Sequence, residues 1–396
     1  MNNTFVLNLV PIASGGGLQN AKSFLETLSN DISKTKKCLI LVQLGSEIEE
    51  SCVTLGLNYI SVRSTHFNRA YFEFQSKELF SNVPTCFTLF GPPPVFSIGK
   101  TVNIIGCAYS NLFYPEIPFW SYLAFQQRCI KEAIDKIRRY LIKRADFWIF
   151  ETEALKVRAI ELCNFPANRV EVVRMAPSKL VSRSLIKQNG KSLLSKNLQN
   201  SFKILYLSGP HPNKRLHLLP EIASAMLKSG CSRFTFITTM DESSPYAVNV
   251  IRQFKENGLE CHIENIGIVP PDNVSTVIDS CDAMCTLSLL ESFSNNFVEA
   301  WQMEKPLVVT DADWSRGCCG DAALYVDPTS ATNAASVFLD LINQPELCKQ
   351  LTTAGRQQLR CYNTPETKLE EYFIAINKAI ILGPISKEER NKIRWP

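Results

Sequence analysis

Residues 203–239, KILYLSGPHPNKRLHLLPEIASAMLKSGCSRFTFITT, contain a complete strand–helix–strand unit. Lys203–Ser208 is an apolar run of strand length that ends in a Gly/Pro loop, residues 215–229 have helical spacing, and Arg233–Thr239 is apolar again. Short apolar strands joined through a helix are typical of parallel sheets wound by right-handed crossovers. The stretch therefore predicts a parallel α/β domain.

The same alternation extends in both directions along the chain. Strands are expected at Thr4–Val10, Lys37–Leu44, Val102–Cys107, Phe147–Glu151, 261–266, 283–287 and Pro306–Thr310, and helices at 19–35, 126–144, 245–257 and from about 295. Between the two series, Ser178–Ser201 is rich in Ser, Asn and Lys and has the composition of a linker. We therefore predict an α/β fold of two doubly wound, Rossmann-like domains that face a central cleft, with ligands at the carboxyl ends of the strands.

Composition sets limits on the function. The 396 residues suit two or three domains, and 45% hydrophobic with 20% charged residues is a globular composition. The longest apolar runs are far shorter than the ~20 residues of a membrane-spanning helix, and residues 1–13 lack the basic start of a signal peptide. Fourteen cysteines without a CxxC pair, and just four histidines, favour reduced thiols over disulfides or a metal site. We expect a cytoplasmic protein.

Charge is distributed unevenly. Residues 1–185 carry 21 Lys and Arg against 15 Asp and Glu, a net +6, whereas residues 186–396 carry 21 against 23, a net −2. The first half is the basic one, so its partner is expected to be anionic.

A glycine loop follows the first strand, in Ser14-Gly15-Gly16-Gly17-Leu18-Gln19-Asn20. Glycines let the backbone approach a ligand closely, and the free N–H groups at a helix start attract phosphate. A strand-to-helix glycine turn also occurs for packing reasons alone. It is not a full GxGxxG pattern, and no acidic residue closes the second strand, which argues against dinucleotide-dependent oxidation.

Two cations, Lys214 and Arg215, stand where the helix after the Gly/Pro loop is expected to begin. Helix starts generally favour acidic residues, so cations there indicate an anionic ligand such as a diphosphate. The alternative is a solvated helix start.

Two glutamates eight positions apart occur in Ser288-Leu289-Leu290-Glu291-Ser292-Phe293-Ser294-Asn295-Asn296-Phe297-Val298-Glu299-Ala300. Ser294 or Asn295 can cap a helix whose first N–H groups form an anion site. Glu291 and Glu299 can each accept hydrogen bonds from vicinal hydroxyls, as sugars present them.

With these motifs, the chain resembles the retaining nucleotide-sugar glycosyltransferases of GT-B fold, family 4 or glycosyl transferases group 1. The resemblance lies in Glu291-x7-Glu299 with Lys305-Pro306-Leu307-Val308-Val309 after it, and in the order of Gly209, Lys214, Gly267 and Gly320–Pro328. It is strongest over 203–365. Cys107–Pro115 is similar to bacterial enzymes that build O-antigen or capsule repeat units.

The resemblance implies a domain plan. Residues 1–185 would bind the acceptor, 186–202 would be a linker, 203–365 would bind the nucleotide sugar, and 366–396, with an amphipathic helix at Thr367–Ile380, would cross back to the N-terminal domain.

It also implies residue roles. Glu299 would bind the ribose, Glu291 the donor sugar, and Lys214 the diphosphate leaving group, so Glu291 and Lys214 are the expected catalytic residues. The other expected donor-binding residues are Gly16, Gly17, Asn213, Arg215, Gly267, Ser294, Asn295, Asn296 and Phe297. Ser110 and Asn111 are candidates for the acceptor site.

Two positions depart from the family. Pro210 follows Gly209 where the family usually has an Arg, so Arg215 or His211 would have to substitute. Tyr109-Ser110-Asn111 stands where many members carry a His. No cofactor or metal is expected, and we interpret Asp311-Ala312-Asp313 as a chance match to the DxD motif because it follows a strand in a different fold context.

Residues 128–144 hold seven cations and two anions. Ile130, Ile134, Ile137 and Leu141 recur at helical spacing, which predicts that this side of the helix belongs to the core. The cations are then either a solvated face or a site for anionic lipid headgroups, with Arg138, Arg139, Lys143 and Arg144 as the membrane candidates. The aromatic residues before the helix suit a membrane interface, a core or an acceptor pocket. Nucleic-acid binding is not expected, since no known binding module frames the helix.

The sequence thus predicts a retaining glycosyltransferase that uses a UDP- or GDP-linked sugar. Its expected acceptor is a glycan, most simply a polyprenyl-diphosphate-linked oligosaccharide at the inner face of the cytoplasmic membrane. Two alternatives stay open: a sugar-nucleotide 2-epimerase, and a catalytically silent GT-B partner that binds sugar nucleotide or glycan.

Overall fold

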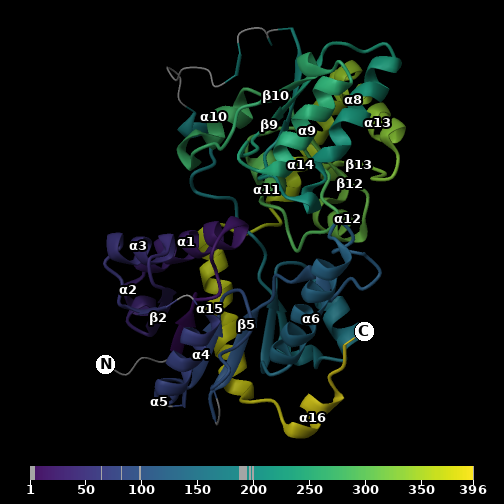
Figure 1. Ribbon diagram of the computed structural model, residues 1–396. Coiled ribbons are helices and arrows are strands. Elements are labelled where there is room, and N and C mark those ends of the chain that lie inside the picture. Colours follow the sequence, from purple (N-terminus) through teal and green to yellow (C-terminus); the bar gives the residue numbers. More distant parts are fainter. Residues whose placement is uncertain are drawn as a thin grey trace. The chain divides into compact units, whose positions relative to one another are not determined.

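The computed structural model describes residues 5–63, 65–81, 83–97, 100–186, 194–195, 198 and 200–395. Most of the expected linker 186–202, and Thr4 of the first expected strand, lie outside the described residues. The chain forms two compact units (Figure 1), unit 1 with Met1–Ala176 and Asn363–Pro396, and unit 2 with Pro177–Tyr362.

Unit 1 is built on a parallel sheet of seven strands among the described residues, in the order β3-β2-β1-β4-β5-β6-β7. The strands are β1 Phe5–Asn8, β2 Cys38–Gln43, β3 Tyr59–Val62, β4 Thr85–Thr88, β5 Val102–Gly106, β6 Phe147–Phe150 and β7 Val170–Val172. Strands β1, β4, β5 and β6 are buried along their whole length, as expected for parallel strands covered on both faces.

Helices cover both faces of this sheet. They are α1 Gly15–Ser29, α2 Ile32–Thr35, α3 Glu47–Thr54, α4 His66–Gln75, α5 Lys77–Ser81, α6 Phe125–Ile142, α7 Glu153–Cys163, α15 Pro365–Leu382 and α16 Lys387–Lys392. The main core of the unit joins α1, α3 and α15 to one face, through residues such as Phe24, Ile48 and Tyr372. Alternate strand residues, for example Val6 and Leu41, form a second cluster on the other face.

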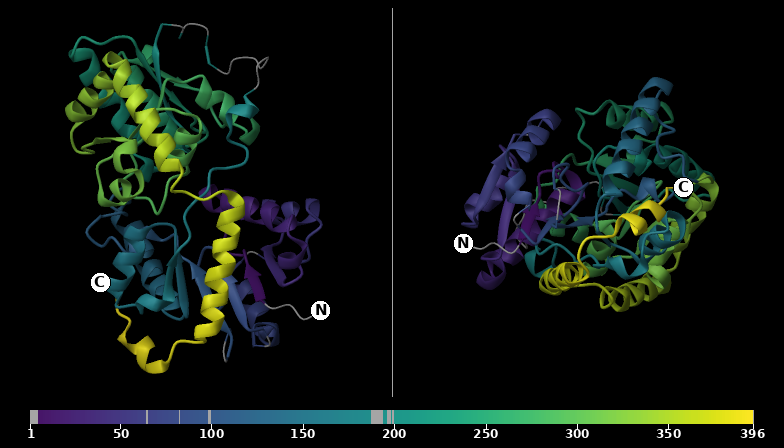
Figure 2. Two further views of the ribbon diagram at one scale, coloured as in Figure 1. Left: turned by 180° about the vertical axis from the view of Figure 1, so that it is seen from behind. Right: turned by 90° about the horizontal axis from the view of Figure 1, so that it is seen from below.

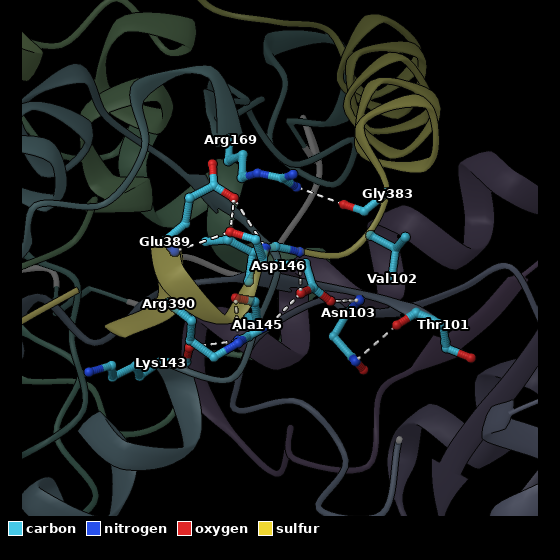
Figure 3. Close-up of polar contacts among 12 residues, drawn as sticks. Thr101, Val102, Asn103, Lys143, Ala145, Asp146, Arg169, Gly383, Glu389 and Arg390 are labelled. Atoms are coloured by element: carbon cyan, nitrogen blue, oxygen red, sulfur yellow. Dashed lines mark hydrogen bonds and ion pairs between the residues drawn. The ribbon is translucent and has the colours of Figure 1, made fainter. Parts of the chain in front are cut away.

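The C-terminal segment is an integral part of unit 1. Helix α15, the long yellow helix of Figure 2, contacts α1, β4 and β5. After it, the chain is fixed by Asp146, whose buried carboxylate accepts hydrogen bonds from Asn103 N at 2.8 Å, Ile385 N at 3.0 Å and Arg390 Nη2 at 2.5 Å (Figure 3). Arg169 adds a hydrogen bond to the carbonyl of Gly383 at 2.7 Å.

Unit 2 has a six-stranded parallel sheet in its described residues, in the order β10-β9-β8-β11-β12-β13. Its strands are β8 Phe202–Tyr206, β9 Phe234–Thr238, β10 Ile263–Asn265, β11 Ala283–Thr286, β12 Leu307–Thr310 and β13 Leu324–Val326. Its helices are α8 Leu219–Lys228, α9 Pro245–Glu256, α10 Val274–Asp279, α11 Asn295–Gln302, α12 Asp313–Cys319, α13 Ala331–Asn343 and α14 Pro345–Leu359. A single large cluster packs α8, α9 and α13 against the sheet.

The two parallel sheets with their helices confirm the predicted α/β class. The local boundaries differ in two informative places. Gly15–Gly17 form the first turn of α1 itself, whereas the sequence predicted a loop before a helix at residue 19. Lys214 ends a short 3₁₀ turn, η5 Pro212–Lys214, and α8 begins at Leu219, so the helix predicted over 215–229 starts later.

The prediction that Ile130 and Ile137 face the core is wrong. Both side chains of α6 are 60% exposed, and the buried residues of this helix are Asp135 and Ile142. Helical spacing identified residues that share a side but not which side is buried.

Candidate functional site

The candidate site in unit 2 lies at the carboxyl ends of β8 and β11. These strands are neighbours, yet the chain leaves β8 toward β9 on one side and returns at β11 on the other. The strand order therefore reverses between them, which is where open α/β sheets bind ligands. Two loops meet here, 207–215 after β8 and 287–294 after β11.

Lys214 and Glu291 form an ion pair across these two loops. The Lys214 Nζ lies against Glu291 Oε1, and the two side chains keep 27% and 15% of their exposure. The structure thus brings together two residues that lie 77 positions apart in the sequence. Each charge neutralises the other, and both side chains are partly exposed.

Asn213 joins the same loops through its side chain. Its Nδ2 donates to the carbonyl of Leu290 at 2.9 Å, its Oδ1 accepts from Leu290 N at 3.3 Å, and its own carbonyl accepts from Leu289 N at 2.8 Å. Asn213 is 7% exposed. Its amide groups are therefore committed to holding the Glu291 loop in register with Lys214, so it positions the pair.

Helix α11 begins just beyond, and its first turn faces the same loops. Ser294 is the residue before the helix, and Asn296 Nδ2 donates to the carbonyl of Leu207 at 2.9 Å, which fixes the helix start to the loop after β8. The ring of Phe297 is buried and stacks on Trp314. The N–H groups of Asn295 and Asn296 belong to the first turn of the helix, and the N–H of Phe297 donates to the carbonyl of Ser294 at 3.1 Å.

Glu299 is buried in the second turn of α11, with 5% exposure. Burial raises the pKa of its carboxyl group to about 7. Among the residues that the structure describes, none donates a hydrogen bond to this side chain. Its oxygens are not among the fully buried polar atoms that lack a partner, so they reach solvent and can accept from a hydroxyl-bearing ligand.

The other residues of unit 2 that were predicted to bind the sugar nucleotide make contacts or turns within the unit. Arg215 has a positive φ of 57° and donates through Nη2 to the carbonyl of Pro328 at 2.9 Å, so its guanidinium is engaged within the unit. Burial lowers the pKa of Arg215. His211 accepts from Asn213 N at 3.1 Å. Gly267, with a φ of 72°, follows the edge strand β10, where a left-handed turn favours glycine.

In unit 1, Gly16 and Gly17 lie at the start of α1, after β1. Gly15 has a φ of 66°, and Ser14 is the N-terminal flanking residue with no side-chain cap. Asn20 donates to the carbonyl of Gly16 at 2.9 Å and accepts from the half-buried Lys368 of α15 at 2.7 Å. The first-turn N–H groups of Gly16 and Gly17 have no internal helical acceptors, and are suited to an anion.

The candidate acceptor loop follows β5 and is fixed to α6. Ser110 is 7% exposed, in the 3₁₀ turn η1 Ser110–Leu112. Asn111 Nδ2 donates to Asp135 Oδ2 at 2.8 Å, and Trp120 Nε1 donates to the same oxygen at 2.7 Å. Asp135 also pairs with Arg138 at 2.9 Å. This buried aspartate is therefore the centre that holds the loop and the helix together.

The four cations predicted to meet a membrane make contacts within unit 1. The guanidinium of Arg138 lies over the ring of Tyr109 at 4.9 Å, and that of Arg139 over the ring of Trp395 at 5.8 Å. Arg144 donates to a backbone carbonyl, that of Val95, at 2.6 Å. The backbone carbonyl of Lys143 accepts from Arg390 (Figure 3). The arginines thus contribute to internal packing.

In the Asp311-Ala312-Asp313 motif, Asp311 forms an ion pair with Arg316. Asp311 accepts two hydrogen bonds from Arg316, at 2.5 and 2.8 Å, and this contact lowers the pKa of Asp311. In the described ranges, no group of three His, Cys, Asp or Glu residues is arranged to hold a metal ion. All fourteen cysteines lie among the described residues, and none of them forms a disulfide.

Sequence reasoning missed three residues that shape these sites. The hydroxyl of Tyr206 donates to the Lys214 carbonyl and accepts from Leu287 N, so it connects both loops from the end of β8. Asp135 was counted simply as a charge on a basic helix. At Gly106, a Cβ atom would lie 1.8 Å from the Leu89 carbonyl oxygen, so this strand end requires glycine. The sequence features that could have pointed to them are the tyrosine at the end of a strand, for Tyr206, and an acidic residue within a cationic helix, for Asp135.

Comparison with known proteins finds a family model that matches most of unit 2. Residues 195–358 match the family model of glycosyl transferases group 1. That range includes Lys214, Glu291 and Glu299. This match covers less than half of the chain, and the two Rossmann-like domains have the GT-B fold.

Solved structures share the fold over almost the whole chain. HepE of Anabaena, in complex with UDP-glucose, has a TM-score of 0.71 at 15% identity, covering 94% of this chain and 99% of that one. Sucrose-phosphate synthase of Thermosynechococcus elongatus has a TM-score of 0.70 at 12% identity, with coverage of 96% and 99%. A putative UDP-N-acetylglucosamine 2-epimerase of Listeria monocytogenes has a TM-score of 0.61 at 11% identity, with coverage of 96% and 97%. These identities show a shared fold alone. Among curated proteins, none matches the sequence.

Proposed function

We propose that the protein is a retaining glycosyltransferase that moves a sugar from a nucleoside diphosphate sugar to a glycan acceptor. The observation that carries this proposal is the buried carboxylate of Glu299 on α11, in the same unit as the Lys214–Glu291 pair at the reversal of strand order. Two adjacent hydroxyls of a ribose suit Glu299, because a carboxylate accepts from both. UDP-glucose in the HepE structure and the group 1 family match support a sugar nucleotide as the ligand.

Lys214 supplies the charge that the reaction requires. When the bond between the anomeric carbon and the β-phosphate oxygen breaks, negative charge grows on that oxygen, and the acceptor hydroxyl oxygen forms the new bond. The acceptor proton passes to the leaving phosphate. Preorganised cations and N–H groups stabilise such charge, and loss of one costs about 2.7–4 kcal/mol. In this proposal Glu291 releases Lys214 to the diphosphate and accepts from hydroxyls of the donor sugar.

Backbone N–H groups share this task. In unit 2, the first turn of α11, from Ser294 to Phe297, is the proposed donor, and in unit 1 the first turn of α1, at Gly16 and Gly17, is proposed as an anion site of that unit. Asn213 and Asn296 position these elements through their own hydrogen bonds, and Gly267 borders the base. Because Arg215 is committed to Pro328, Lys214 is the main cation in place of the family's missing Arg.

For the acceptor, we propose a polyprenyl-diphosphate-linked oligosaccharide used in cell-surface polysaccharide synthesis. The loop of Tyr109, Ser110 and Asn111 would form one wall of its site in unit 1, with Asn111 as a positioning residue. Such an acceptor would bring the enzyme to the inner face of the cytoplasmic membrane. No helix in the described ranges is long and apolar enough to cross a lipid bilayer.

The test is a product screen with a panel of UDP- and GDP-sugars, with and without extracted lipid-linked acceptors. Transfer with an unchanged anomeric configuration, measured by NMR, is the expected result. Lys214→Met should lower turnover by about 10²–10³-fold. Lys349→Met is the matched control, since Lys349 forms an exposed ion pair with Glu346 on α14.

Other outcomes would separate the alternatives. Conversion of the sugar nucleotide itself, without acceptor, would identify a 2-epimerase. Nucleotide-sugar binding with no product from any donor and acceptor pair would identify a silent binding partner. An inverted anomeric product would refute the retaining mechanism.

A further inference from the structure

Arg215 has a backbone conformation that its residue type disfavours. Among the residues that the structure describes, three residues other than glycine have a positive φ, namely Asn164, Arg215 and Glu304 at 54°, 57° and 56°. This left-handed region is sparsely populated by such residues, because the Cβ atom comes close to the following carbonyl oxygen. Strain of this kind persists only where the surrounding structure enforces it, and it clusters at functional sites.

The place of Arg215 in the fold separates it from the other two residues. Asn164 caps the C-terminal end of α7, and Glu304 follows the last turn of α11, where a left-handed residue commonly ends a helix. Arg215 instead stands between two short 3₁₀ turns, η5 and η6 Leu216–Leu218. A right-handed residue here would join the two turns into one helical segment and turn the Lys214 side chain with it. The left-handed conformation of Arg215 therefore determines where Lys214 points.

Contacts with distant segments hold this conformation in place. The Arg215 Nη2 donates to the carbonyl of Pro328, in the loop after β13, at 2.9 Å. The Arg215 N–H donates to the carbonyl of Pro212 at 3.0 Å, and the Lys214 carbonyl accepts from the hydroxyl of Tyr206 at the end of β8. Two different strand ends thus fix the residues on which the direction of Lys214 depends.

We propose that Arg215 is a positioning residue, which holds Lys214 in the direction that meets Glu291 and, during the reaction, the diphosphate. The inference rests on the proposed function, because that function assigns Lys214 to the leaving group. Arg215 itself acts through the turn, since its guanidinium is bound to Pro328. A cation stabilises growing charge well when it is already in place, and a displacement of ~1 Å can lower a rate by about 10²-fold.

The experiment compares Arg215→Gly with Arg215→Ala in the full-length protein. Both variants lose the contact with Pro328, but glycine adopts the left-handed conformation without strain, whereas alanine keeps the Cβ atom and its penalty. The kcat for nucleotide release from a sugar donor should fall by about 10²-fold in Arg215→Ala. Arg215→Gly should stay within about tenfold of the wild type, because it retains the turn. Circular dichroism checks the fold of each variant.

Glu304 supplies the matched control. It belongs to the same unit, has the same φ, and lies at the far end of α11, ~12 Å along the helix from the first turn. Glu304→Gly should be more stable than Glu304→Ala in thermal unfolding, for the same backbone reason, and both should release nucleotide like the wild type. A purely structural role for Arg215 would give this pattern as well, with altered stability and unchanged kcat, and would overturn the inference.

A loss of 10²-fold or more in Arg215→Gly, equal to that in Arg215→Ala, would assign the guanidinium to direct contact with the diphosphate and also overturn the inference. This result is decisive even if Arg215→Ala does not fold.

Crystal structures of the two variants give a reading that needs no activity. The Lys214–Glu291 pair should persist in Arg215→Gly and separate in Arg215→Ala, and an intact pair in both would refute the positioning role. If the pair behaves as expected but the wild type releases no nucleotide with any donor and acceptor, the proposed function fails while the positioning of Lys214 stands.

Discussion

Replacing Glu299 by Gln should stabilise the protein without ligand, and by more at higher pH. Burial raises the pKa of this carboxyl to about 7, from an ordinary value of 4.5. The folded state therefore holds a proton that the unfolded state has lost between these two pH values. The wild type loses stability as the pH rises from about 4.5 to about 7, and the loss then stays constant. The difference corresponds to about 3 kcal/mol.

The glutamine side chain of the variant stays neutral in both states, so it has no such loss. The free energy of unfolding of Glu299→Gln should match the wild type near pH 4 and exceed it by up to about 3 kcal/mol at pH 8. Urea denaturation between these limits, followed by the fluorescence of Trp301 and Trp314 in unit 2, measures the difference. Glu256→Gln on α9 is the control, because its side chain is 59% exposed, and it should have little effect at any pH.

The same substitution should weaken nucleotide binding if Glu299 accepts from a ribose. Hydroxyl donors favour the charged carboxylate, so binding of UDP or GDP to the wild type should strengthen as the pH rises from 6 to 8. Glu299→Gln should bind at least about tenfold more weakly at pH 8, with little pH dependence. If the free energies of unfolding of the two proteins differ by the same amount at every pH from 5 to 8, burial does not raise the pKa of Glu299. Equal nucleotide affinity would refute the ribose assignment.

Two further substitutions test the contacts that position these parts. Asn213→Ala leaves the N–H and carbonyl of Leu290 without partners, and should lower the free energy of unfolding by about 1–3 kcal/mol, measured in urea, together with donor turnover. Asp146→Ala leaves the partly buried guanidinium of Arg390 without its carboxylate partner, although the Lys143 and Ala145 carbonyls still accept from it, and should cost about 3–5 kcal/mol and speed proteolysis within 383–395. The exposed Glu388→Ala should leave the digestion pattern unchanged, and equal cleavage in both variants would show that Asp146 does not hold the segment.

The sequence by itself determined the parallel α/β fold, because the strands of both units are short apolar runs bounded by Gly, Pro and polar residues. It also indicated where a ligand would bind in unit 2. Lys214 and Glu291 follow β8 and β11, and parallel strands end at one edge of a sheet. These are local properties, and each can be identified from a window of a few residues. The strands with weaker patterns, such as β3 and β13, were not found this way.

The tertiary structure alone decided which side of each element is buried and what each polar group contacts. Helical spacing placed Ile130 and Ile137 together, but Asp135, fixed by residues 15 and 24 positions away, turned them to solvent. Glu299 has a raised pKa because the packed unit removes water from around it, which no spacing records. Burial and hydrogen bonding between distant segments depend on the whole fold, whereas a pattern in the sequence describes neighbours along the chain.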